Sequence, residues 1–232
     1  MVSSLSIWLF LKIAERGVYM NQKITIAINR EYGSGGRTIG EMISKDLGIP
    51  YYDKQLEEFA SEDSGIAAKF FTDAEENFKN RLLVESEPYT GEILEPDDKD
   101  YTTPKNLFAL QAKTIHRLCD AEACVMVGHG AGFVLKDRTN VIRIFVHADK
   151  EHLLERAALR MSLSPKELEK YVEKENKRRA DYNFYYTGEK WDDAHNYDIS
   201  LNSSNLGLDK CLEVIEGYMK VRFDGLELRK CK

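Results

Sequence analysis

The chain has 232 residues, of which 43% are hydrophobic and 31% are charged, and its formal net charge is −6. This composition is typical of a folded globular protein with a core of its own. The acidic balance disfavours a protein that grips long nucleic acid, because phosphate backbones are bound by basic surfaces. The four cysteines show neither zinc-ligand spacing nor a dense disulfide framework, which indicates reduced thiols and a cytoplasmic location.

The first twenty residues differ from those that follow. Residues 4–13 read SLSIWLFLKI, an apolar run that is too short to span a bilayer. The run also lacks the basic start and the small-residue cleavage site of a signal peptide. Because Met20 opens a natural beginning for a first strand, we expect residues 1–20 to be an extension outside the core. A peripheral amphipathic anchor is the alternative.

A strand, a glycine-rich loop and a helix are predicted next. The run KITIAIN, residues 23–29, is short, apolar and β-branched, as in a buried strand. Three glycines then fall within residues 33–36, and apolar residues at helical spacing continue as far as Leu47. Gly48 and Pro50 end the predicted helix.

The rest of the chain alternates strands with helices. Helices are predicted to begin after Thr103, Asp149 and Ser164, residues that can act as N-caps. Such alternation predicts an α/β protein with a parallel sheet of about five strands, covered on both faces. Residues 85–101 are acidic, contain prolines and lack periodicity, so we expect a mobile insertion there. The further predicted strands are residues 49–53, 124–128, 141–148 and 197–202, and the last helix spans about 206–221.

The glycine loop, residues 33–38, has the composition of a phosphate site. Where glycine removes the Cβ, backbone N–H groups can point at an anion, and the following helix adds its positive N-terminal end. A tight turn that needs glycine for its geometry alone is the alternative. Against the pattern G-x-x-x-x-G-K-[ST], Arg37 stands in the lysine place and Glu31 in that of the first glycine. Thr38, or else Ser34, could hold Mg²⁺ through its hydroxyl.

Three blocks follow one another along the chain: ITIAINREYGSGGRTIGEMISKDLGIPYYDKQL, VMVGHGAGFVLKDRTNVIRIFVHAD and KRRADYNFYYTGEKWDDAHNYDISLN. In this order they resemble the cytidylate kinase-like family, a branch of the nucleoside monophosphate kinases. The resemblance implies a three-layer P-loop kinase fold with a helical lid. It also implies ATP with Mg²⁺ as donor and a nucleoside monophosphate, nominally cytidine monophosphate, as acceptor. The implied plan is one domain over residues 21–225, with an acceptor-side helical insertion at 53–103, a lid at 164–192 and a tail at 226–232.

The same resemblance assigns roles on the donor side. Arg178 and Arg179 of the lid would act on the transferring phosphoryl group, together with Arg37 of the glycine loop. Thr38 would hold Mg²⁺ beside the ATP phosphates. The ATP-binding residues would be Gly33, Ser34, Gly35, Gly36, Arg37, Thr38, Asn202 and Ser203.

On the acceptor side, the resemblance points to Asp53, His129 and Arg156. Asp53 matches the aspartate of a turn close to the acceptor. His129 and Gly130 stand where cytidylate kinases carry an Arg-Asp pair, and Leu153 replaces an arginine although Arg156 is retained. These departures concern the choice of acceptor more than the fold.

The sequence therefore predicts a cytoplasmic kinase that moves the γ-phosphoryl group of ATP to a small phosphorylated acceptor such as cytidine monophosphate. Its partners would be these two small molecules, with no long nucleic acid and no membrane span. A nucleotide-binding module without turnover, acting as a sensor or binding a partner, is one alternative. The absent loop lysine and the altered acceptor motif motivate it. A kinase for a non-nucleotide metabolite is the other alternative.

Overall fold

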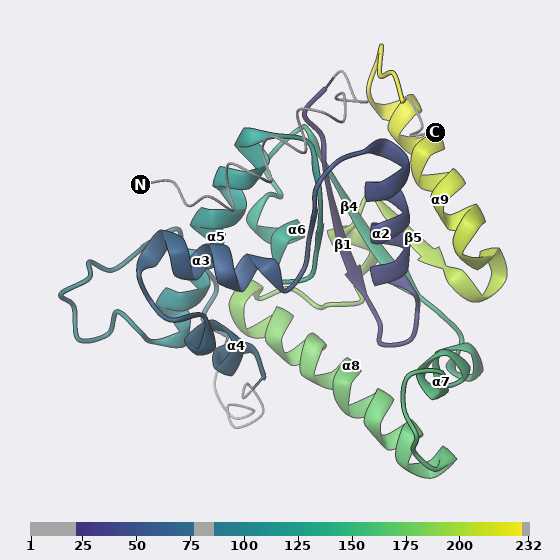
Figure 1. Ribbon diagram of the computed structural model, residues 1–232, viewed down its shortest axis with the longest axis horizontal. Coiled ribbons are helices and arrows are strands. Elements are labelled where there is room, and N and C mark those ends of the chain that lie inside the picture. The colour runs from purple at the N-terminus through teal and green to yellow at the C-terminus, as the bar shows by residue number, and fades with distance from the viewer. Residues whose placement is uncertain (1–21, 77–85, 229–232) are drawn as a thin grey trace.

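A computed structural model describes residues 22–76 and 86–228 of the chain (Figure 1). Its centre is a five-stranded sheet in the order β2-β3-β1-β4-β5, and every neighbouring pair of strands is parallel. All five predicted strands are confirmed, with small differences at their ends. The strands are β1 (Thr25–Arg30), β2 (Tyr51–Tyr52), β3 (Cys124–Val127), β4 (Val141–His147) and β5 (Ile199–Asn202).

Helices cover both faces of the sheet, because successive strand side chains point to opposite sides. On one face Ile26 and Ile28 of β1 join a cluster with α2 (Gly36–Leu47) and α9 (Ser203–Arg222). On the other face Ala27 packs towards the remaining helices, which include α3 (Gln55–Ser64), α5 (Pro104–Ala121) and the short α6 (Ala131–Val134). Figure 1 shows these two layers on either side of the strands. The predicted three-layer α/β fold is confirmed.

The predicted helix starts are also confirmed. Thr103 and Asp149 are the N-caps of α5 and of α7 (Lys150–Ala158). Ser164 opens α8 (Pro165–Thr187) with the capping box that its spacing to Glu167 predicts. This helix, the body of the predicted lid, packs Leu168 and Val172 against α7 and crosses below the carboxyl ends of the strands (Figure 1).

The segments outside this frame are only partly described. Residues 1–20, the predicted extension, lie outside the described residues. The acceptor-side insertion contains α3 and α4 (Ala68–Glu76). Residues 86–101 contain neither helix nor strand, yet the backbone N–H groups of Glu87 and Tyr89 bond to carbonyls of α8. Leu226 and Leu228 pack against the α2/α9 core, so the packed domain extends beyond the predicted boundary at residue 225. Within the described residues, no helix is both long enough and apolar enough to cross a bilayer.

Candidate active site

Several of the predicted site residues follow the carboxyl ends of parallel strands, which meet at one edge of the sheet. The glycine loop follows β1, Asp53 follows β2, and His129 follows β3. From β1 the chain continues to β2 at one edge of the sheet, whereas from β3 it crosses to β4 on the other side, so the two connections leave these neighbouring strands in opposite directions. Ligands of open α/β sheets bind in the crevice at such a position. The topology therefore brings together residues that lie far apart in the sequence.

The glycine loop has the open backbone that the sequence predicts. Gly33 and Gly35 have φ angles of 87° and 83°, a region that favours glycine, and Gly35 is the N-cap of α2. A methyl group on Gly33 would overlap the carbonyl oxygen of Leu153. Glycine is therefore required at these two positions. A hydrogen bond from the start of α9 holds the loop in place, since the Ser203 hydroxyl donates to the carbonyl oxygen of Ser34 at 2.7 Å. The first N–H groups of α2 have no acceptor within the helix, so they can bind a ligand in the space above the loop.

That space is a cavity of about 350 Å³, called here the arginine cavity. It lies against the glycine loop and the first turn of α2, where the helix end carries a partial positive charge. Thr38 and the carboxylate-bearing Glu31 also line it. A cavity with this concentration of guanidinium groups suits a ligand with several negative charges. Its five arginines are Arg30, Arg37, Arg156, Arg160 and Arg179.

Arg179 is the cation of the lid that reaches this cavity. Its Nη1 donates to the carbonyl oxygen of Arg30 at 3.0 Å, and its guanidinium lies 5.5 Å from the centre of the Tyr32 ring. Within the described part of the chain, its buried Nε meets no acceptor. Burial, followed by the charges of Arg30, Arg178 and Arg37, lowers the pKa of Arg179 to about 9. An anion in the cavity would relieve both the unsatisfied donor and the repulsion between cations.

Arg37, in the place of the expected lysine, turns towards the acceptor side. Its Nε lies 2.6 Å from Asp53 Oδ2, while the residue also lines the arginine cavity. Arg30, at the end of β1, approaches the same carboxylate with 3.8 Å between Nη2 and Oδ1. Sequence reasoning missed Arg30, although its position at the end of β1, three residues before the glycine loop, was a usable signal. Asp53 therefore neutralises part of the positive charge of Arg30 and Arg37, which lie between the arginine cavity and the predicted acceptor side.

His129 is held in an unusual backbone conformation. It lies between Gly128 and Gly130, and all three residues have positive φ, 56° for His129 itself. Among the described residues, His129 is the one non-glycine with such an angle, which is a strained state for a histidine. Its ring is buried, with Nε2 3.9 Å from Asp53 Oδ1 and Nδ1 3.1 Å from Gln111 Nε2. The turn thus fixes the imidazole beside Asp53, on the predicted acceptor side.

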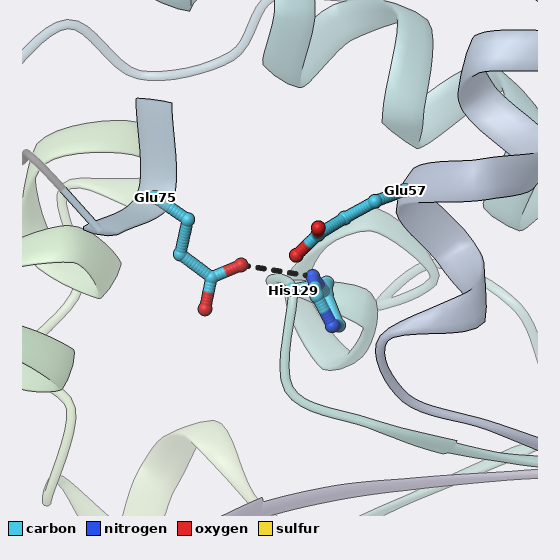
Figure 2. A group of neighbouring side chains, drawn as sticks. All are labelled: Glu57, Glu75 and His129. Atoms are coloured by element: carbon cyan, nitrogen blue, oxygen red, sulfur yellow. Dashed lines mark ion pairs between the residues drawn. The ribbon is translucent and has the colours of Figure 1, made fainter. Parts of the chain in front are cut away.

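Two carboxylates from the insertion surround this imidazole, and we call Glu57, Glu75 and His129 the His129 cluster. Glu75 Oε2 lies 3.0 Å from His129 Nδ1, and one ligand atom from each of the three residues lies within 4.8 Å of the others (Figure 2). Such a group could hold a metal ion. The flanking guanidinium of Arg178, with Nη1 3.9 Å from Glu75 Oε1, instead favours a network of ion pairs.

Within the cluster, Glu75 and His129 each favour the charged form of the other. Burial alone would raise the pKa of Glu75, but the charges of His129, Arg178 and Arg30 outweigh burial and lower it to about 2. Burial likewise disfavours a charged His129, yet Glu75 and then Asp53 raise the pKa of His129 above its ordinary value. A protonated imidazole facing an ionised Glu75 follows from these directions.

Several predicted residues lie elsewhere than expected. Arg156 does not join Asp53 and His129. Its Nη1 lies so close to Gly35 that a methyl group there would overlap it, and the residue lines the arginine cavity. Ser203 is fully buried and its hydroxyl is used within the protein. Asn202 caps α9 by accepting from Ser204 N at 2.9 Å. These two side chains hold the glycine loop and α9 rather than reaching into the arginine cavity.

Arg178, predicted beside Arg179 on the transferring group, contacts the His129 cluster instead. Its Nε donates to Glu175 at 3.2 Å, and its Nη1 donates to the carbonyl oxygen of Glu75 at 3.1 Å. Arg178 and Arg179 are adjacent in the sequence but serve two different parts of the site. The role of Glu75 was not foreseen, since a single glutamate on a helix carries no distinguishing pattern.

Comparison with known proteins shows the family of the chain. The profile of the cytidylate kinase-like family matches residues 25–205, so the chain belongs to that family. The cytidylate kinase of Sulfurisphaera tokodaii is 24% identical over 197 residues, which cover 84% of this chain and 94% of that enzyme. Among solved structures, an uncharacterized protein from Eubacterium ventriosum matches with a TM-score of 0.63 and 25% identity, covering 84% of this chain and 98% of that one.

Proposed function

We propose that this member of the cytidylate kinase-like family transfers the γ-phosphoryl group of ATP to a small phosphorylated acceptor such as cytidine monophosphate. The observation that carries the proposal is the arginine cavity, which is lined by five arginines and lies against a glycine loop and a helix N-terminus. Phosphoryl transfer depends mainly on positioning and on neutralising charge. Membership of the family and its characterised relative supply the reaction class. We expect the enzyme to work in the cytoplasm.

On the donor side, the N–H groups of residues 33–38 would cradle the ATP phosphates. Arg179 and Arg37 would neutralise the charge on the transferring group, and Arg156 would add a contact beside Gly35. Thr38 fits Mg²⁺ better than Ser34, because Thr38 lines the cavity whereas the buried Ser34 hydroxyl donates to the Glu31 carbonyl at 2.9 Å. Mg²⁺ supplies charge neutralisation and geometry for the phosphate oxygens when it is bound.

On the acceptor side, Arg178, His129 and Asp53 would face the incoming molecule. An oxygen of the acceptor phosphate attacks the γ-phosphorus, the bond from that phosphorus to the β–γ bridging oxygen breaks, and ADP leaves. Arg179 stands at the boundary of the two sides, where the γ-phosphoryl group would move from one oxygen to the other. The protein's contribution is alignment and fixed positive charge.

A coupled assay of ADP release, run with a panel of nucleoside monophosphates and neutral or phosphorylated metabolites, tests the proposal. We expect turnover with at least one nucleoside monophosphate and loss of that turnover in an Arg179→Ala variant. Turnover with a non-nucleotide metabolite alone would reassign the acceptor. ADP release with none of the panel at high enzyme concentration would overturn the proposed activity.

A second candidate is a nucleotide-binding module without turnover. The ion pair between Arg37 and Asp53 favours it. Arg37 stands at the lysine place of the loop pattern, and its charge is balanced by Asp53 instead of facing the ATP phosphates alone. Binding of ATP without ADP release in the wild type, together with ADP release in an Arg37→Lys variant, would support this reading. Robust turnover by the wild type would exclude it.

A further inference from the structure

The acceptor side of the site is closed. The cleft lined by His129, Arg178 and Glu75 measures about 20 Å³, whereas the adjoining arginine cavity measures about 350 Å³. A space of about 20 Å³ accepts about one water molecule. Small-molecule sites usually enclose roughly 300–1,000 Å³. A side chain must therefore move before an acceptor can reach His129.

Glu75 is the side chain that fills this position. It comes from the last turn of α4 and reaches across to the turn after β3, as Figure 2 shows. Its two carboxylate oxygens lie 3.0 Å from His129 Nδ1 and 3.9 Å from Arg178 Nη1. Arg178 also binds the Glu75 main-chain carbonyl, which ties the end of α4 to α8.

The surroundings of Glu75 resemble those that a phosphate group requires. Positive groups arrive from three separate elements: Arg30 from β1, His129 from the turn after β3, and Arg178 from α8. Together they keep the Glu75 carboxylate ionised. A phosphate monoester carries up to two negative charges and more acceptor oxygens than a carboxylate, so the same cations would attract it more strongly.

We propose that Glu75 is an internal competitor that occupies the anion-binding position of the acceptor until a phosphate group displaces it. The inference rests on the proposed function, since it takes the side of His129 and Arg178 as the acceptor side. This competition makes the site selective for phosphorylated molecules. When Glu75 leaves, His129 and Arg178 lose the negative charge that pairs with them, and a neutral acceptor cannot replace that charge. Displacement requires a turn of the Glu75 side chain or a shift of α4.

The test follows the His129 imidazole by NMR while inorganic phosphate is added at about pH 6, where a histidine of ordinary pKa is largely charged. The signal is assigned by its absence in a His129→Gln variant. Removing the competing charge in Glu75→Gln should lower the half-saturating phosphate concentration by about 3- to 30-fold. The matched control is Asp73→Asn, which removes an exposed charge from the same helix and should leave the titration unchanged.

Phosphate binding of equal or lower affinity in folded Glu75→Gln would overturn the proposal. A His129 signal that responds in neither protein would do the same. Should Glu75→Gln not fold, Glu75→Asp replaces it, since the shorter side chain weakens both ion pairs and should shift the titration in the same direction. If neither variant folds, Glu75 is structural and the proposal fails. Because phosphate binding needs no turnover, this result is independent of the ADP-release assay that tests the proposed function.

Discussion

The two sides of the site contain similar cations but differ in what balances them. The arginine cavity is open, and Arg179 within it keeps an unsatisfied donor. The acceptor side is closed, because Asp53 and Glu75 form ion pairs with Arg37, His129 and Arg178. On the proposed function, the position of the carboxylates would decide which side is ready for a ligand. Removing a cation should therefore weaken ligand binding in the arginine cavity. Removing a carboxylate should strengthen anion binding beside His129.

The largest effect is expected from removing the unsatisfied cation of the open side. Arg179→Ala should lower kcat/KM by about 10²–10³-fold, because a preorganised charge on the transferring group is lost. It should also abolish the stabilisation of the fold by ATP with Mg²⁺ in a thermal-shift measurement. The control is Lys177→Ala, which removes an exposed cation of the same helix that pairs with Asp181. A loss no greater than that of the control would contradict the role given to Arg179.

The next effect concerns the backbone of the glycine loop. Gly35→Ala forces a side chain into positive φ, at about 1–2 kcal/mol, and its methyl group would overlap Arg156. We expect ATP affinity, measured by calorimetry, to fall about tenfold or more because the phosphate cradle is displaced. Gly65→Ala is the matched control, since Gly65 has φ of 75° but open space around it. Equal ATP affinities in the two variants would show that the loop is only a turn.

A smaller effect is expected from removing the hydrogen bond by which Ser203 holds the glycine loop. Ser203→Ala removes the hydrogen bond to the Ser34 carbonyl, which should cost about 1 kcal/mol of unfolding free energy. It should also weaken ATP binding about fivefold, since the loop is less well held. The exposed Ser200 of β5 provides the control, Ser200→Ala. Urea unfolding that does not separate the two variants would rule out the fastening role.

The smallest effect is a pH dependence of the closed side. His129 has a raised pKa, so its contribution to stability is complete below its ordinary pKa and is lost as pH rises through the folded value. Glu75 has a pKa lowered to about 2, so its contribution is complete above its ordinary pKa and is lost as pH falls towards 2. The unfolding free energy of wild type minus that of Glu75→Gln should therefore peak between about pH 4.5 and 6.5. A difference that does not change between about pH 5 and 9 would contradict the His129–Glu75 pair.

Much of the fold follows from local patterns. The strand over residues 23–29, the glycine loop and the cap at Ser164 depend on neighbouring residues, so the sequence predicts them well. Arg156 shows the limit of such reasoning. Its helix follows β4, but only the packing of α7 against the glycine loop places its guanidinium beside Gly35 rather than beside Asp53.

The glycine loop is determined by the sequence alone, because its glycines form a short pattern with a conformational preference of its own. The tertiary structure decided how the charges around the loop are paired. Glu75 and His129 belong to separate elements, and so do Asp53 and Arg37. The strength of a charge pair depends on distance and burial, which only the folded chain defines. The loop therefore predicts a phosphate site, while the fold alone decides which carboxylates lie beside the cations around it.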